Sequence, residues 1–245
     1  MERRKHPKLN LWLRIPWLVC IPVTWLLFRK QWRGLEHIPA SGGAIVVANH
    51  ISYADPASFI NFIYDAGRIP RFLAKSSLFD VFLLGRVMRR CACIPVYRGS
   101  AEAKDSLRAA VAAVRAGECV VIYPEGTVTR DPDWWPMLAK TGVARLALET
   151  DVPVIPVAQW GPQLAVDVYN KRYRLLGRRK PVTVQAGQPV DLSAYRDQPV
   201  TGALLREVTD VVMRAVRDQL AEIRGETPPA EFYRRPKPAA SAEPA

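Results

Sequence analysis

Residues 44–56 read AIVVANHISYADP, and this stretch does most to decide the fold. Its first five residues are small or β-branched and apolar, which is typical of a strand buried on both faces. Asp55 followed by Pro56 favours the beginning of a helix, because proline fits the first helical turn and the residue before it avoids helical backbone angles. We therefore expect a central strand, a turn and a helix that continues to Asp65.

Short apolar runs alternate with helical patterns after this stretch. Gly117 directly follows one helical pattern, at a position where glycine commonly ends a helix. The sequence predicts strands at residues 71–74, 93–97, 119–123, 154–157 and 181–186, and helices at residues 104–116, 141–149 and 201–224. This alternation predicts an α/β fold with a mostly parallel sheet covered by helices.

The segment before residue 34 differs from the rest in composition. Residues 15–28 are uncharged, but they are too few for a straight helix to cross a bilayer, and two prolines interrupt them. Tryptophans at positions 12, 17 and 25 lie among flanking Lys and Arg, as in segments that anchor at a membrane interface. We expect residues 1–33 to be a basic, Trp-rich membrane-associating segment. The alternative is a core helix or helical hairpin with its tryptophans packed inward.

The rest of the chain is expected to form one domain and a tail. Residues 34–225 carry the alternating pattern and are long enough to bury a substantial core. Residues 226–245 are rich in proline and alanine, so we expect them to be disordered. No CxxC pair is present, and we expect reduced, buried, cytosol-facing thiols at all four cysteines, which are Cys20, Cys91, Cys93 and Cys119.

The net charge of +12 indicates anionic partners: a lipid surface, a phosphate-bearing substrate or nucleic acid. Residues 1–33 contribute +7 of this charge. A second basic cluster lies in residues 171–180 and contains no acid, and a solvated surface explains it as well as a binding site does. Nucleic acid is not favoured, because no recognition motif is present and aromatic residues are not interleaved with the cations.

His50 and Asp55 are the candidate catalytic pair. An aspartate five residues after a histidine, across a strand-to-helix turn, can bind imidazole Nδ1–H and leave Nε2 free to take a proton from a hydroxyl. Ligands of such sheets bind beyond the carboxyl ends of the strands, where this turn lies. Taken singly, Asp55 is equally explained as a helix start and His50 as a buried structural histidine. His6 and His37 lie in less structured settings, so a histidine base would be His50.

Residues 123–127 read YPEGT and follow another apolar strand. Glycine lets the backbone approach a ligand closely, and amides followed by a hydroxyl can bind an anion. An ordinary Pro-Glu-Gly turn is the alternative. Lys75 and Arg98 also follow predicted strands; together they would hold a phosphate, and singly they could be surface charges.

Several chemistries have no local support in the sequence. It contains no Walker A loop, no GxGxxG motif and no nucleophile elbow, which argues against nucleotide hydrolysis, hydride transfer and serine hydrolysis. No cluster of metal-ligating residues is visible, so neither a metal nor a cofactor is expected.

Four ordered motifs resemble those of the glycerolipid acyltransferases, among which the bacterial 1-acylglycerol-3-phosphate acyltransferases are most similar. The resemblance covers about residues 30–190 and begins with the lead-in GLEHIP at residues 34–39. The motifs are His50-x4-Asp55, Arg98, residues 123–127 and residues 152–157. The resemblance implies an α/β acyltransferase domain at residues 34–225 with a short N-terminal membrane-associating helical element.

The resemblance also implies a reaction in phospholipid biosynthesis. A fatty acyl group would pass from acyl-CoA or acyl-carrier protein, as co-substrate, to the sn-2 hydroxyl of 1-acylglycerol-3-phosphate, giving phosphatidic acid. His50 would deprotonate that hydroxyl, and Asp55 would orient His50. The residues implied to bind the acceptor and its phosphate are Lys75, Arg98, Glu125, Gly126 and Thr127, with Asn49 and Arg130 as further candidates.

The protein would then be peripheral or monotopic on the cytoplasmic face of the plasma membrane. Its partners would be anionic membrane lipids, the lysophospholipid acceptor and the acyl donor, and not nucleic acid.

The sequence departs from the family pattern at two places. Val128 and Thr129 stand where the third motif usually continues with Arg and Ser, and Arg130 would supply the cation from a shifted position. The segment after Lys75 lacks the usual Glu and Pro. Another lipid acceptor, a glycolipid or a different lysophospholipid, is therefore the alternative. A non-catalytic basic protein that binds membranes or nucleic acid is a more distant one.

Overall fold

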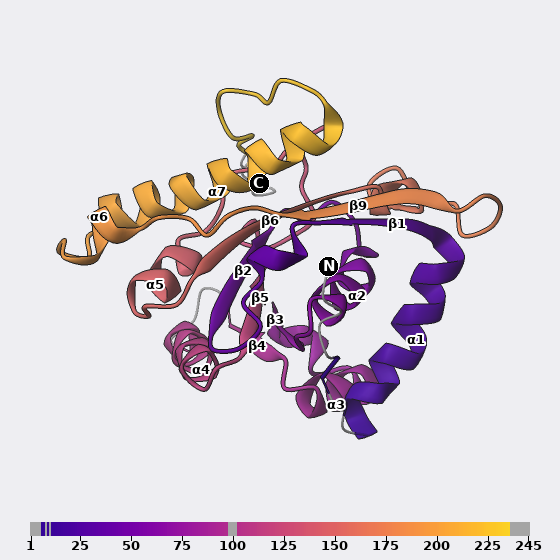
Figure 1. The fold of residues 1–245 in the computed structure, drawn as a ribbon, viewed down its shortest axis with the longest axis horizontal. Helices are drawn as coiled ribbons and strands as arrows, with labels where there is room; N and C mark the ends of the chain where they lie inside the picture. The colour runs from indigo at the N-terminus through magenta and orange to yellow at the C-terminus, as the bar shows by residue number, and fades with distance from the viewer. Residues whose placement is uncertain (1–5, 8, 10, 98–101, 236–245) are drawn as a thin grey trace, which may run out of the picture.

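The computed structural model describes residues 6, 7, 9, 11–97 and 102–235. In these residues, seven strands form one sheet in the order β1-β9-β6-β2-β5-β3-β4, and β7 pairs with β8 in a separate ribbon (Figure 1). The strands are β1 (Phe28–Arg33), β2 (Ala44–Ala48), β3 (Pro70–Lys75), β4 (Ile94–Val96), β5 (Cys119–Ile122), β6 (Val154–Trp160), β7 (Val166–Asp167), β8 (Arg172–Tyr173) and β9 (Lys180–Ala186). The helices are α1 (Leu11–Leu27), α2 (Asp55–Asp65), α3 (Phe82–Arg90), α4 (Ala103–Arg115), α5 (Gly142–Leu148), α6 (Ser193–Arg196) and α7 (Gly202–Arg224), with short 3-10 turns at η1 (Leu35–His37), η2 (Ser76–Leu78) and η3 (Pro162–Leu164).

The predicted mostly parallel α/β sheet is confirmed. Neighbouring strands of the sheet run parallel, except that β9 runs antiparallel to β6. The carboxyl ends of five strands therefore meet at one end of the sheet, and these strands are β2, β3, β4, β5 and β6. We call this end, which runs across the strands, the site edge. The carboxyl ends of β1 and β9 lie at the opposite edge.

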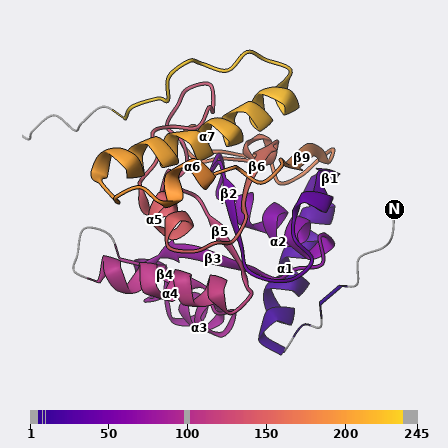
Figure 2. The same ribbon diagram turned by 60° about the vertical axis from the view of Figure 1, so that its left-hand side comes forward.

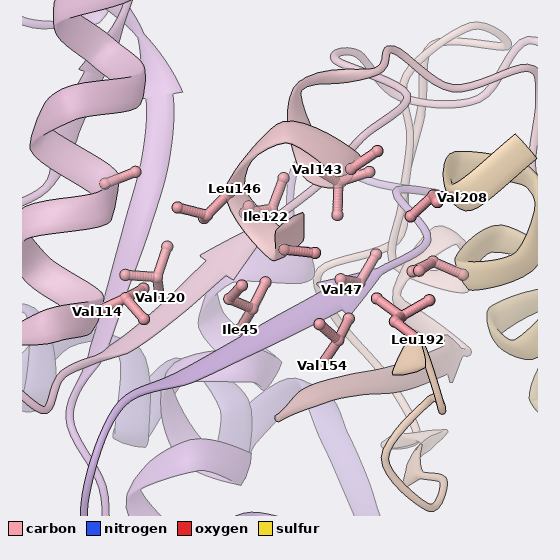
Figure 3. Packing of buried hydrophobic residues seen from close by; sticks show 14 of the residues in the cluster. Ile45, Val47, Val114, Val120, Ile122, Val143, Leu146, Val154, Leu192 and Val208 are labelled. Atoms are coloured by element: carbon pink, nitrogen blue, oxygen red, sulfur yellow. The ribbon is translucent and has the colours of Figure 1, made fainter. Parts of the chain in front are cut away.

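Two layers of helices cover the sheet because the side chains of each strand alternate between its faces. On β2, Ile45 and Val47 face the core formed with α4, α5 and α7 (Figure 3). Val46 and Ala48 face the other core, where α2 contributes Phe59 and other buried residues. Figure 2 shows α7 and α2 on opposite sides of the sheet. Each side chain of β2 is buried, as its uninterrupted apolar sequence predicts.

Helix α7 coincides with the helix predicted at residues 201–224, to within one residue. The Thr201 hydroxyl accepts a hydrogen bond from the Leu204 amide at 3.1 Å and so caps the first turn. Gly225 ends the helix with a φ of 65°, a left-handed conformation that costs glycine little.

The N-terminal segment differs from the expected one at its boundary. Residues 28–33 form β1, which pairs with β9 along its whole length, and Phe28 is fully buried. The sheet therefore begins inside the segment that we expected to be separate from the domain. The sequence did not predict β1 as a strand because its residues are mostly charged or polar, and an edge strand tolerates charged side chains that point into solvent.

Helix α1 is one continuous helix, with Pro16 and Pro22 inside it, and not a hairpin. It packs against α2 and α3, and Trp12 and Trp17 are partly buried there. Trp25 is 64% exposed, and the other exposed large apolar side chains of α1 are Leu11, Ile15, Leu18, Val19, Val23 and Leu26. No helix in the described ranges is both long and apolar enough to cross a membrane.

The tail and the cysteines also differ from expectation. Residues 226–235 pack against the domain: Tyr233 pairs with Met137 in a β-bridge, and Arg217 donates to the carbonyls of Pro229 and Ala230. The expected disorder is therefore wrong for these ten residues, and residues 236–245 lie outside the described ranges. All four cysteines are free, but Cys119 alone among them is buried.

Candidate active site

The turn that follows β2 holds the proposed catalytic pair. His50 Nδ1 lies 2.7 Å from Asp55 Oδ2. The same oxygen accepts the backbone amides of Ile51, at 2.7 Å, and Ser52, at 3.0 Å. The Asp55 carboxyl is fully buried, whereas the His50 side chain keeps 16% of its surface exposed. The short turn between β2 and α2 thus brings His50 and Asp55 together, as their five-residue spacing predicts.

The environment of Asp55 determines how the imidazole is held. Burial raises the pKa of Asp55, and hydrogen bonds from His50 and the two turn amides oppose that rise. Oδ2 accepts two backbone N–H groups and is therefore an unprotonated acceptor oxygen. The proton in its contact with His50 is then on Nδ1, which leaves Nε2 as the basic nitrogen. In the described part of the chain, no group hydrogen-bonds to Nε2.

Tyr123, the residue that follows β5, forms one wall of the site. Its ring stacks on the His50 imidazole with centroids 4.5 Å apart and planes 22° apart. Phe72 stacks on Tyr123 at 6.3 Å, and Phe59 meets Tyr123 edge-on at 5.8 Å. The sequence placed Tyr123 in the YPEGT motif after β5 but did not predict its contact with His50.

Glu125 does not lie where a ligand-binding carboxylate would. It is 3% exposed, with Oε1 accepting the His50 amide at 2.9 Å and Oε2 accepting the Met137 amide at 3.0 Å. Burial raises the pKa of Glu125 to about 8, against the lowering effect of these amides. Both oxygens are therefore engaged by the protein backbone, and Glu125 joins the His50 turn to the loop that contains Met137.

Backbone hydrogen bonds also fix the residues that follow Glu125. Gly126 has a φ of 74°, which explains the glycine, and its amide donates to the Tyr123 carbonyl at 2.9 Å. The Thr129 amide donates to the His50 carbonyl at 2.7 Å. Val128, at the position where the family usually has Arg, is 2% exposed. Thr127 is half-buried between these braced residues.

Asn49 also serves the backbone rather than an open site. It is fully buried, and its side-chain amide forms hydrogen bonds with both the backbone N–H and the carbonyl of Gln159 on β6. Gln159 returns a hydrogen bond to the Asn49 carbonyl and accepts one from Ser58 on α2. We did not identify Gln159 from the sequence, because nothing near it in the sequence marks a buried glutamine as a link between β2, β6 and α2.

The structure does not show the cations that we expected to bind the phosphate gathered in one place. Lys75 is exposed at the carboxyl end of β3, on the site edge. Arg98 lies outside the described residues. Arg130 is exposed with its guanidinium 4.9 Å from the centre of the Tyr169 ring, at a cavity of about 550 Å³. This cavity is also lined by Trp134, Asn170, Tyr233 and Arg235, and His50 is not among its lining residues.

Comparisons with known proteins identify the family of the chain. A family model described as Acyltransferase matches residues 29–160, more than half of the chain. A structure described as the 1-acyl-sn-glycerophosphate acyltransferase of Thermotoga maritima is similar, with a TM-score of 0.62, 27% identity and coverage of 86% of this chain and 80% of that one.

Among curated proteins, the chloroplastic 1-acyl-sn-glycerol-3-phosphate acyltransferase BAT2 of Brassica napus is 29% identical over 55% of this chain and 38% of that protein. The Borreliella burgdorferi protein named 1-acyl-sn-glycerol-3-phosphate acyltransferase is 32% identical over 51% of this chain and 48% of that one. The chain thus spans less than two thirds of the length of these curated relatives. Its fold and the matched family region lead to the same conclusion: the chain belongs to the acyltransferase family.

Proposed function

We propose that this protein transfers a fatty acyl group from a thioester, acyl-CoA or acyl-carrier protein, to the sn-2 hydroxyl of 1-acylglycerol-3-phosphate. The names of its relatives support this reaction. The single observation that carries the proposal is the hydrogen bond between His50 Nδ1 and buried Asp55 on a turn at the site edge. It directs the lone pair of Nε2 away from Asp55 and makes that nitrogen a proton acceptor.

In the proposed reaction, His50 Nε2 takes the proton of the acceptor hydroxyl as its oxygen attacks the thioester carbonyl carbon. The new C–O bond forms, the carbonyl oxygen becomes an oxyanion, and the C–S bond then breaks. The imidazolium returns its proton to the departing thiolate, so the products are the ester and the free thiol. Asp55 orients the ring and stabilises the imidazolium throughout. The protein forms no covalent acyl intermediate.

The amides of Thr127 and Val128 are the candidates to stabilise the oxyanion. In the described residues neither amide N–H has a hydrogen-bond partner, whereas the neighbouring amides of Gly126 and Thr129 are both used. They lie between Gly126, which bonds the Tyr123 carbonyl, and Thr129, which bonds the His50 carbonyl. Backbone donors fixed in this way stabilise developing negative charge without reorganising during the reaction.

Cations that follow strands of the sheet in the sequence are proposed to hold the acceptor's phosphate. Lys75 ends β3 on the site edge, and Arg98 follows β4 in the sequence and is kept as a candidate. Arg130 is proposed as the replacement for the family's usual arginine, because Val128 is buried and Arg130 is exposed one residue beyond Thr129. Glu125, Gly126 and Asn49 are proposed to position the turn.

We further propose that the protein binds the surface of anionic membranes through α1. Large apolar side chains of α1 are exposed, and α3 adds Phe82 and Leu83, at 82% and 70% exposure. Trp12 of α1 lies under Arg90 of α3, with the guanidinium 5.0 Å from the ring centre. Helix α1 also packs on α2, which begins with Asp55, so a lipid acceptor would reach His50 from the membrane.

A second acceptor is favoured by one observation. Val128 stands where the family usually has arginine, and the cavity beside Arg130 is lined by Asp131 and Asp167 as well as by aromatic side chains, which suits a headgroup other than a bare phosphate. A glycolipid or another lysophospholipid is therefore the alternative acceptor.

The test is to supply purified protein with radiolabelled acyl-CoA and, separately, with 1-acylglycerol-3-phosphate, other lysophospholipids and a lyso-glycolipid, and to separate the products. Labelled phosphatidic acid as the main product supports the proposal. Product from another acceptor alone would reject lysophosphatidate, and transfer to none of them with either donor would reject the acyltransferase assignment.

A further inference from the structure

The basic segment at residues 171–180, which contains β8 and leads to the start of β9, is a second surface that the proposed reaction does not use, and we call it the basic loop. Residues 171–180 contain no acidic residue, and their cations are Lys171, Arg172, Arg174, Arg178, Arg179 and Lys180. The tip of this loop is apolar: Leu176 is 89% exposed, Tyr173 62% and Leu175 48%. Exposed large apolar side chains that are flanked in the sequence by cations suit a partner that offers hydrocarbon directly beneath negative charge.

The base of the loop is attached to α1. The Arg179 guanidinium lies 5.3 Å from the centre of the Trp25 ring and donates two hydrogen bonds to the Phe28 carbonyl, at 2.9 and 2.6 Å. Figure 1 shows the orange loop before β9 beside the end of α1. The exposed Trp25 of α1 thus lies against the base of the loop.

The loop also lies on the site edge of the molecule. Because β9 runs antiparallel to β6, its first residue, Lys180, lies at the edge where β6 ends and where His50 is found. Helix α1 leads into the beginning of β1 at the same edge, since β1 is parallel to β9. A flat partner touching both α1 and the loop tip would therefore lie beside the catalytic turn.

We propose that residues 171–180 form a membrane-docking loop that inserts Leu175 and Leu176 at the bilayer interface and binds anionic lipid headgroups through Arg174 and Arg178. The inference rests on the proposed membrane-surface function and assigns the basic cluster to the same partner as α1. A bilayer is favoured over nucleic acid because phosphate binding alone would not require exposed leucines at the tip. The loop would then orient the site edge toward the membrane, where α1 alone would allow rotation about its own axis.

The experiment measures the binding of full-length protein to vesicles of equimolar phosphatidylcholine and phosphatidylglycerol, and to vesicles of phosphatidylcholine alone, by co-sedimentation. Two double variants are compared with wild type: Leu175→Ser with Leu176→Ser, and Arg174→Gln with Arg178→Gln. The matched controls are Arg206→Gln with Arg214→Gln, which removes the same charge from exposed positions on α7, and Val200→Ser, which removes an exposed apolar side chain. Arg179 is left intact because it hydrogen-bonds to Phe28.

Each loop variant should bind the anionic vesicles at least about tenfold more weakly than wild type, and the controls should bind like wild type. The arginine variant should show a smaller loss on phosphatidylcholine alone, whereas the leucine variant should lose binding on both. In detergent micelles with dispersed substrates, both loop variants should keep the wild-type rate of acyl transfer.

The possible failures separate the two proposals. Tight wild-type binding that the loop variants retain would overturn the docking loop and leave the membrane function of α1 in place. No binding of wild type to either vesicle would overturn both. Unchanged vesicle binding together with loss of duplex nucleic-acid binding in the arginine variant would assign the loop to nucleic acid instead.

Discussion

Among single residues, Glu125 best shows how the site is held together. Its two oxygens bond the amides of His50 and Met137, so one carboxylate fixes the catalytic turn and the loop opposite it. The sequence marks Glu125 as part of a motif, but motif membership does not distinguish a residue that touches substrate from one that positions the residue that does. His50 and Asp55 could be predicted because five residues suffice to define their pairing. The contact between Tyr123 and His50, and that between Asn49 and Gln159, join distant segments and required the fold.

Glu125→Gln should weaken both folding and catalysis. The glutamine NH2 group would face one of the two amide donors, leaving that buried N–H without an acceptor, at a cost of about 1–3 kcal/mol in the free energy of unfolding. Acyl transfer should fall with it, because the His50 turn loses its brace. Urea denaturation and the transfer rate measure the two effects, with Glu207→Gln as the exposed control. Wild-type stability and rate in Glu125→Gln would show that the brace is unimportant.

The free energy of unfolding should depend on pH in the direction set by the raised pKa of Glu125. The folded protein raises this pKa from its ordinary value of 4.5 to about 8, so between these values the folded state binds the proton more tightly than the unfolded state. Folding therefore takes up a proton, and the contribution of Glu125 to stability falls as pH rises through this window, by roughly 1 kcal/mol per pH unit. Denaturant midpoints of wild type and Glu125→Gln should converge toward high pH. A difference between them that is constant with pH would contradict the raised pKa.

At the scale of whole elements, the sequence predicts the buried strands and the longer helices well. Their side chains that face the core must be apolar, and this gives the regular spacing of apolar residues that identifies them. It does not reveal β1, whose exposed edge carries cations, or α3, whose sequence combines an exposed apolar turn with arginines. Helix α1 is predicted as an apolar segment, but its neighbours are not, since its contacts with α2 and α3 come from distant parts of the chain.

Helix α1 should be tested by substitution and not by removal of residues 1–33, because that deletion would also remove β1 from the sheet. Leu18→Ser with Leu26→Ser changes two side chains that are 62% and 60% exposed, so folding should be unaffected. Binding to anionic vesicles should fall by about tenfold or more, because two leucines are lost from the interface. Val200→Ser is the control, and retention of tight vesicle binding by the double variant would show that α1 is not the anchor.

At the scale of the whole molecule, the C-terminal segment is connected to the active site. The Leu138 amide donates to the Tyr233 carbonyl, and Tyr233 pairs with Met137, whose amide holds Glu125. Composition predicts disorder for this segment and misses the connection, because proline-rich sequence can be ordered when another part of the fold supplies hydrogen-bond partners. The segment that contains Tyr233 is therefore linked through Met137 to Glu125 and the His50 turn.

Ending the chain after Gly225 should reduce acyl transfer and lower thermal stability, since the loop that carries Met137 loses its bridge to Tyr233 and Arg217 loses its contacts with the tail. Ending it after Arg235 keeps all of these contacts and is the matched control, which should match wild type. The melting temperature and the transfer rate of the two truncated proteins measure the effect. Equal behaviour of the two proteins would show that residues 226–235 contribute nothing to the site.

The account depends most directly on His50, and its sharpest test is the rate of acyl transfer to 1-acylglycerol-3-phosphate by His50→Ala. The control is His37→Ala, because His37 hydrogen-bonds to the carbonyl of Ala186 at the opposite edge of the sheet. We predict that His50→Ala loses activity by about a hundredfold to ten-thousandfold while it stays folded and bound to vesicles, and that His37→Ala stays close to wild type. A His50→Ala protein that transfers acyl groups at the wild-type rate would contradict the central claim.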